Sequence, residues 1–182
     1  MSSRDNTALE GLLVVGGLAA LYYFRDKLFP VTTPSESLVY KIQGLEGYFG
    51  VGTINPLDGH IVIGYGHDGD LTIHDNPADN KVQVGTPISS SDALAQLVMD
   101  IDEAGSNVLS YVTVPMTQNQ LDGLTDFEFN TGAGEDDVYT YVNNGDWQGA
   151  ANWMKSHYLT SNGVQQPGLV TRRAWDAQML LS

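Results

Sequence analysis

The sequence predicts an α+β fold, in which a small lobe of one helix and a β-hairpin precedes a larger helical lobe. The hairpin is predicted because residues 49–54 and 60–65 are rich in glycine, valine, isoleucine and threonine and flank an Asp58-Gly59 dipeptide. Asp-Gly between two β-prone runs is typical of a tight hairpin turn. One capped helical pattern precedes the hairpin and four follow it. Strands grouped in this way indicate an α+β rather than an alternating α/β arrangement.

The first helix of the domain is predicted to begin after Thr33, with Pro34 at its first position and Glu36 closing a capping box. Gly47 is suited to ending it. Its apolar stripe consists of Leu38, Ile42 and Leu45. Glu46 then falls on the last turn, where the helix dipole disfavours a negative charge. A partly buried carboxyl at this position suits a general acid, although most glutamates at helix ends are simply solvated.

The helices after the hairpin are predicted from their caps and apolar spacing. Thr117 and Gln120 form a second capping box, and the sequence Asn144-Gly145-Asp146 predicts a turn and a cap before another helix. The predicted helices cover residues 90–112, 117–131, 146–158 and 168–182.

The composition excludes several classes of function. The 182 residues include 22 acidic and 8 basic side chains, a formal net charge of −14, and no cysteine. Without cysteine there is no disulfide, no thiolate zinc site and no cysteine nucleophile. The acidity argues against nucleic-acid binding, which depends on cations that neutralise phosphates. Because His60, His74 and His157 lack metal-ligand spacing, we expect neither a metal nor a cofactor.

The N-terminal 30 residues differ from the rest of the chain. They contain three acidic and three basic side chains, so residues 31–182 carry the whole net charge. The run 11–24 is uncharged and ends in three aromatic residues followed by Arg25 and Lys27, a pattern typical of a membrane interface. As a helix this run spans roughly 21 Å, whereas the hydrocarbon core of a bilayer is ~30 Å thick.

Three interpretations of this run compete. A cleaved signal peptide is disfavoured because no small-residue cleavage site follows the run. A buried helix is the alternative to the favoured interpretation, a membrane anchor. We therefore predict a single-pass transmembrane or signal-anchor helix in residues 1–30, with lipid contact through residues 8–27. A linker at 31–35 would then lead to a folded domain at 36–182.

Four blocks in the folded domain resemble the phage-type lysozymes, glycoside hydrolase family 24. These blocks occur in family order and cover nearly all of the soluble part: residues 45–47 with 63–67, then 117–122, 127–134 and 168–174. The resemblance implies a lysozyme-like fold that cleaves the β-1,4 bond between N-acetylmuramic acid and N-acetylglucosamine in peptidoglycan. Glu46 matches the family's catalytic glutamic acid, which protonates the leaving glycosidic oxygen.

Two other positions depart from the family pattern. Asn55 stands where the family has an aspartate, and Val62 stands where it has a threonine. Asparagine cannot act as a base or a nucleophile. Asp58 is one candidate for the missing carboxylate, although it is equally an ordinary turn residue. A second possibility is that Glu46 acts alone, as in lytic transglycosylases. The third is a catalytically degenerate domain that binds glycan or serves as a structural virion protein.

The resemblance also implies supporting residues. His67 matches the histidine beside the family's site, and Phe129 and Asn130 match its cleft-lining block, so these three are the predicted substrate-binding residues. Arg172 and Arg173 match residues that support the helical lobe, which suggests ion pairs. We expect a membrane-anchored enzyme of a phage internal membrane or a host inner membrane, facing the cell wall. An exported endolysin and a virion-associated entry enzyme both fit this expectation.

Overall fold

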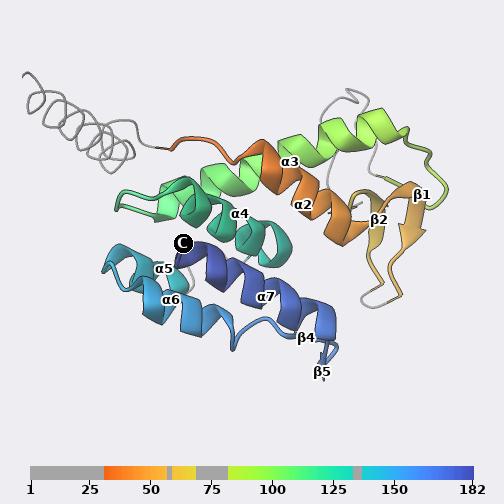
Figure 1. The fold of residues 1–182 in the computed structure, drawn as a ribbon. Coiled ribbons are helices and arrows are strands. Elements are labelled where there is room, and N and C mark those ends of the chain that lie inside the picture. The colour runs from red at the N-terminus through yellow and green to blue at the C-terminus, as the bar shows by residue number, and fades with distance from the viewer. Residues whose placement is uncertain (1–30, 57–58, 69–81, 133–136) are drawn as a thin grey trace, which may run out of the picture.

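The computed structural model describes residues 31–56, 59–68, 82–132 and 137–182 (Figure 1). The predicted anchor in residues 1–30 lies outside the described residues, as do Asp58 and His74. None of the helices in the described ranges is long and apolar enough to cross a membrane.

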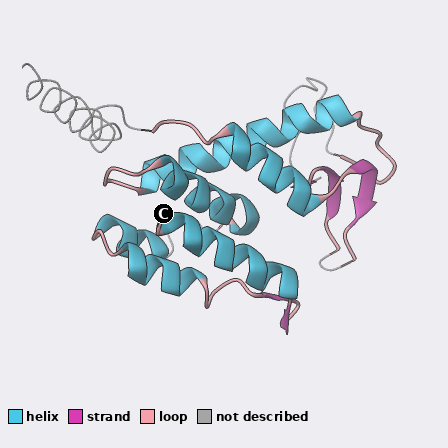
Figure 2. Cartoon of the chain, viewed as in Figure 1, coloured by secondary structure: helices cyan, strands magenta, loops and turns pink. Residues whose placement is uncertain are grey.

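The small lobe contains helix α2 (Glu36–Glu46) and a three-stranded antiparallel sheet in the order β1-β2-β3. Strands β1 (Phe49–Ile54) and β2 (Ile61–Gly64) form the predicted hairpin, which is confirmed (Figure 2). The third strand, β3 (His67–Asp68), pairs with β2 and was not predicted. The turn between β2 and β3 lies beside the end of α2, because an added Cβ at Gly66 would lie 3.0 Å from Glu46 Oε2.

Helix α2 is capped by Ser35 and not by Thr33, which corrects the predicted start. The Ser35 hydroxyl accepts a hydrogen bond from the Leu38 amide at 3.3 Å, and the Ser35 amide donates to Asp122 Oδ1 at 2.9 Å. Contact with a distant carboxylate therefore moves the cap by two residues. Leu45 belongs to the predicted apolar stripe, but it is not buried with Leu38 and Ile42, because the residue is 41% exposed and lines a cavity.

The helical lobe is built around a central helix that packs against two others. Helix α4 (Gln118–Thr131) begins at the predicted Thr117–Gln120 capping box and contacts both α3 (Ser90–Tyr111) and α7 (Pro167–Leu180). Helix α3 also contacts α2 and β2, so it connects the two lobes. The lobe is completed by α5 (Asp137–Asn143), α6 (Trp147–Met154) and the two-stranded sheet of β4 (Thr160–Ser161) and β5 (Val164–Gln165).

Three elements of this lobe differ from the prediction. Helix α6 ends at Met154, four residues earlier than expected, and Tyr158 adopts a left-handed backbone with φ of 55°. A right-handed α-helix needs a φ of about −63° at every residue, so it cannot continue through Tyr158. Helix α5 and the β4–β5 hairpin were not predicted at all.

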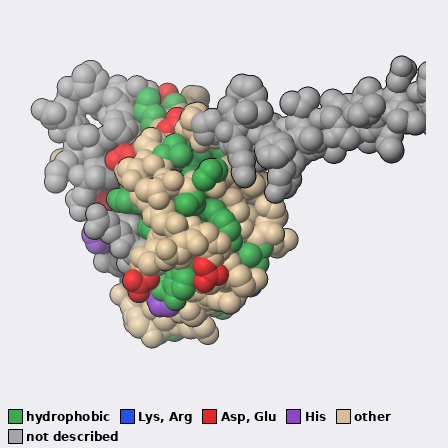
Figure 3. Space-filling model, turned by 90° about the vertical axis from the view of Figure 1, so that its left-hand side faces the viewer, with side chains coloured by type: hydrophobic (Ala, Val, Ile, Leu, Met, Phe, Trp, Pro, Cys, Tyr) green, Lys and Arg blue, Asp and Glu red, His purple; other side chains and the backbone are tan. Residues whose placement is uncertain are grey.

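The interior consists of two apolar clusters, one in each lobe. The larger surrounds Phe127 of α4, and the smaller joins Leu38 and Ile42 of α2 to Leu97 and Ile101 of α3. On the face shown in Figure 3, the Asp, Glu, Lys and Arg side chains that can be seen among the described residues are acidic.

Candidate active site

Three adjoining cavities meet at Glu46. The hairpin cavity, of about 570 Å³, lies over β1 and β2, and the α7 cavity, of about 560 Å³, lies against the start of α7. The α3 cavity, of about 340 Å³, lies between α3, α4 and the β2–β3 turn. Glu46 and Asn130 line all three cavities. A chain of sugars that crosses from one lobe to the other would therefore pass these two side chains.

The position of Glu46 is set by two glycines. Gly47, with φ of 71°, ends α2 immediately after Glu46 and turns the chain into β1. At Gly66, with φ of 84°, an added Cβ would lie 3.0 Å from Glu46 Oε2. A side chain at position 66 would thus be strained and would press on the carboxylate. The side chain of Glu46 remains 22% exposed, so it is accessible from the cleft.

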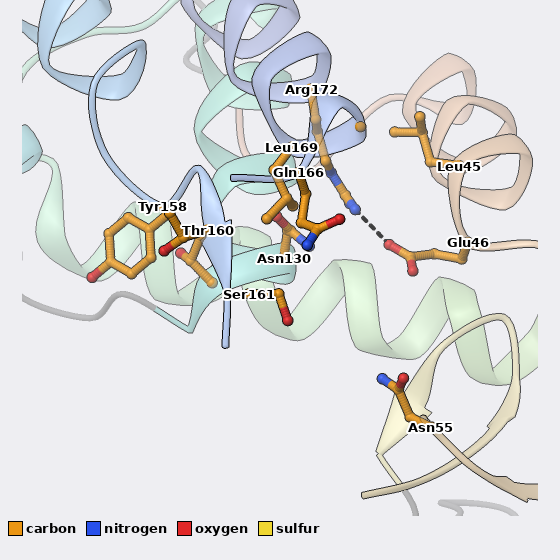
Figure 4. A pocket seen from close by; sticks show the side chains of 12 residues that line it. Leu45, Glu46, Asn55, Asn130, Tyr158, Thr160, Ser161, Gln166, Leu169 and Arg172 are labelled. Atoms are coloured by element: carbon orange, nitrogen blue, oxygen red, sulfur yellow. Dashed lines mark hydrogen bonds and ion pairs between the residues drawn. The ribbon is translucent and has the colours of Figure 1, made fainter. Parts of the chain in front are cut away.

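Arg172 contacts the Glu46 carboxylate directly. Its Nη1 donates to Glu46 Oε1 at 2.6 Å, while Nε and Nη2 form a bidentate pair with Asp126 at 3.0 and 2.8 Å. Burial alone would lower the pKa of Arg172, but the hydrogen bonds and charges of the two carboxylates outweigh burial and raise it. The cation therefore holds one oxygen of Glu46, with Asn55 projecting from the hairpin on the other side of the cavity (Figure 4).

Beneath Arg172 lies a second, fully buried group of charges. Arg173 pairs with Asp176 at 2.8 Å, and the charge of the neighbouring Asp126 also acts on Asp176. Burial and the neighbouring Asp126 charge raise the pKa of Asp176 well above its ordinary value. Burial would also raise the pKa of Asp126, but its hydrogen bond to Arg172 lowers it.

Arg173 also orients a residue of the cleft. Its Nη2 donates a hydrogen bond to Asn130 Oδ1 at 3.1 Å. The amide oxygen of Asn130 therefore accepts from Arg173, and its NH₂ group can act as a donor toward the cavities. The predicted ion pairs of Arg172 and Arg173 are present. The contact between Arg172 and Glu46 was not predicted.

The other residues predicted for the site gather near Glu46. Asn55 lines the hairpin and α7 cavities, and Val62 lines the hairpin cavity. His67 and Phe129 line the α3 cavity. His67 is buried, and its Nδ1 lies 2.9 Å from Asp100 Oδ2, which ties β3 to α3. This contact gives His67 a structural role, and substrate binding by His67 stays a prediction.

Sequence reasoning missed Asp126 and the cleft role of Arg172. The sequence offers one signal for Asp126, which stands beside the inward-facing Phe127 in the pattern of α4, and the structure shows that Asp126 is fully buried. A buried carboxylate needs a cation, and the tandem arginines are among the few cations in the domain. In the parts of the chain that the structure describes, no group of three His, Asp or Glu side chains is placed to hold a metal ion.

The chain has a helix–hairpin lobe and a helical lobe, and a glutamate at the end of a helix lines the cleft between them. These features define a lysozyme-like protein. A family model described as phage lysozyme matches residues 45–176, and the chain belongs to that family. The predicted lysozyme-like α+β fold is thereby confirmed for the described residues.

Individual relatives agree with this assignment. The chain is 31% identical over 134 residues to an endolysin of Bacillus phage B103, covering 70% of this chain and 45% of that protein. It is 33% identical over 121 residues to an endolysin of Acyrthosiphon pisum secondary endosymbiont phage 1, covering 63% of this chain and 75% of that protein. The chain thus spans about half the length of the first of these relatives.

Two solved structures are also similar to this chain. The muramidase domain of SpmX from Asticaccaulis excentricus has a TM-score of 0.69 at 30% identity, covering 84% of this chain and 99% of that domain. An endolysin from Escherichia coli O157:H7 phage FAHEc1 has a TM-score of 0.66 at 26% identity, covering 81% and 92%.

Proposed function

We propose that this protein cleaves peptidoglycan at the β-1,4 bond between N-acetylmuramic acid and N-acetylglucosamine, with Glu46 as the general acid. The observation that carries the proposal is the position of Glu46 at the junction of the three cavities. Arg172 holds Oε1, so Oε2 is the oxygen that faces the glycosidic oxygen of a bound glycan. The names of the relatives, endolysin and muramidase, support peptidoglycan as the substrate.

His67, Phe129 and Asn130 are proposed to line the bound glycan on the helical side of Glu46. The oriented amide of Asn130 supports this, because an NH₂ group is suited to donating to a sugar hydroxyl or acetamide oxygen. Phe129 lies beside Arg172, whose guanidinium carbon is 5.9 Å from the ring centroid. His67 is proposed to hold this side of the cleft in place through Asp100.

The amide of Asn55 at the cleft favours a second candidate reaction. In a lytic transglycosylase the substrate's own hydroxyl attacks, and a single glutamate serves first as acid and then as base. A degenerate domain that only binds glycan would also tolerate Asn55 and Val62. Asp58, the substitute carboxylate predicted from the sequence, lies outside the described residues and stays a prediction.

The product of digestion distinguishes these candidates. We expect the full-length protein to release soluble fragments from purified peptidoglycan, with N-acetylmuramic acid at their reducing ends in mass spectra. Anhydromuramic ends would instead identify a transglycosylase. Moderate salt is needed in the assay, because an acidic domain is repelled by an anionic wall when the Debye length is long. No release at any salt concentration would contradict catalysis and leave the glycan-binding alternative.

We further propose that residues 1–30 anchor the protein to a phage internal membrane or the host inner membrane, with residues 31–35 linking the anchor to the domain. The uncharged run 11–24 and its aromatic and basic end support this. An anchor would also hold the acidic domain near the anionic cell wall, which otherwise repels it. After cell fractionation we expect the full chain with the membranes and a chain lacking residues 1–30 in the soluble fraction. Equal partitioning of the two would contradict the anchor.

A further inference from the structure

The cleft-facing side of the small sheet carries a row of three residues. Thr53 on β1 pairs with Val62 on β2, and Val62 pairs with Asp68 on β3. Residues directly opposite each other in an antiparallel pair point to the same face. All three accordingly line the hairpin cavity. The other face of this sheet is internal, since Ile63 and its partner His67 are both buried.

This register places the acidic side chain of Asp68 at the hairpin cavity, which Glu46 also lines. Of the described residues that line the hairpin cavity, the carboxylates are Glu46 and Asp68. Asp68 also lines the α3 cavity, which it shares with Glu46 and Gly66. It is only partly buried, so water reaches it. Asp68 and Glu46 therefore face the same space from two different elements.

The position of Asp68 matters because of its neighbour. Val62 stands where the resemblance implies a threonine that helps to hold the attacking water, and Asp68 is its direct partner on the next strand. Neighbouring strands lie only ~4.8 Å apart, so a carboxylate at Asp68 reaches the space over Val62. On the other side of Val62, the Thr53 hydroxyl donates to the Val51 carbonyl at 2.9 Å. Its lone pairs remain able to accept a hydrogen bond from a water.

We infer that Asp68 is the catalytic base of the proposed glycan cleavage and replaces the carboxylate lost at Asn55. The inference rests on the proposed function. Glu46, protonated, gives its proton to the glycosidic oxygen as the bond from that oxygen to the anomeric carbon breaks. Asp68 takes a proton from the water whose oxygen forms the new bond to that carbon. The step ends with Glu46 ionised and Asp68 protonated, and proton exchange with solvent restores both.

Asn55 and His60, which also line the hairpin cavity, are less suited than Asp68 to act as the base. The Asn55 amide has no proton-accepting group of sufficient basicity. His60 lines the hairpin cavity, but it is an exposed residue before the start of β2 and lies outside the Thr53–Val62–Asp68 row. Asp68 is the choice that combines a carboxylate, access to water and a fixed position beside Val62.

The test compares the rates at which full-length variants release reducing ends from purified peptidoglycan. We expect Asp68→Asn to lose about 100- to 10,000-fold in rate, the usual effect of removing a positioned acid–base group. Binding of the variant to insoluble peptidoglycan and its melting temperature should stay near wild type, because asparagine has the same shape. Asp68→Ser, which keeps a hydroxyl but cannot take up the proton, should lose activity to a similar extent. Asp102→Asn, an exposed position on α3 away from the cleft, is the matched control.

Each other outcome counts against the inference. A rate for Asp68→Asn within about threefold of wild type would overturn it. A loss found instead in Asp58→Asn or His60→Gln would assign the base to that residue. Anhydromuramic products from the wild type would show that water is not the attacking group. An inactive wild type, in contrast, contradicts the proposed function itself, so the two failures are distinguishable.

Discussion

Replacing Glu46 with glutamine is expected to lower the rate of peptidoglycan cleavage by about 100- to 10,000-fold. Glutamine has the shape of glutamate but cannot protonate the glycosidic oxygen. Its amide oxygen can still accept from Arg172, which keeps its bidentate pair with Asp126. The fold and the shape of the cleft should therefore persist. The measurement is the initial rate of reducing-end release, with circular dichroism and a melting curve on the same samples.

Glu36→Gln provides the matched control for this variant. Glu36 lies on the same helix as Glu46, is exposed, and is located at the opposite end from the cleft. It should keep the wild-type rate within about threefold. A Glu46→Gln rate within about tenfold of wild type would contradict the role of Glu46 as general acid.

Replacing Arg172 with methionine is expected to reduce the free energy of unfolding by about 3–5 kcal/mol, as when one partner of a buried ion pair is removed. Asp126 is fully buried and would lose both hydrogen bonds from Arg172. Methionine fills much of the same space, so the loss reflects the uncompensated charge more than a cavity. Urea-induced unfolding of the variant and the wild type measures the difference.

A second substitution separates charge from packing. Adding Asp126→Asn to Arg172→Met removes the uncompensated charge and should restore part of the stability. Lys155→Met removes a cation from an exposed position at the end of α6 and should change stability by less than about 0.5 kcal/mol. A loss below about 1 kcal/mol for Arg172→Met would contradict the importance of its contact with Asp126.

Much of the fold follows from short-range patterns. The Asp-Gly turn predicts the β1–β2 hairpin, and the Thr117–Gln120 capping box predicts the start of α4. The position of Glu46 at the end of α2 follows from Gly47 directly after it. Caps, turns and apolar spacing act over a few residues, so one sequence is enough to find them.

The structure differs from the sequence predictions where residues that are far apart in the chain come into contact. Ser35 replaces Thr33 as the cap of α2 because Asp122, 87 residues away, binds it. Leu45 fits the apolar spacing of α2, but its side chain faces a cavity. Spacing along one helix cannot tell which side of its stripe another element will cover.

Contacts between distant residues also limit what the sequence can predict of the candidate site. Glu46 and Arg172 are 126 residues apart, and nothing local to either predicts their contact. Asp68 enters the cleft only through the strand register that pairs it with Val62, and β3 is too short to be predicted from spacing. Glu46 itself could be chosen from the sequence because its helix and its family block agree.

Glu46 is proposed to be the general acid that cleaves the glycan chains of peptidoglycan. One time course tests this role most directly. Purified peptidoglycan is digested in moderate salt with full-length wild type or Glu46→Gln, and soluble reducing ends are counted. We predict steady release by the wild type and almost none by the variant. Release by the two proteins at the same rate, or none by either, would contradict the claim.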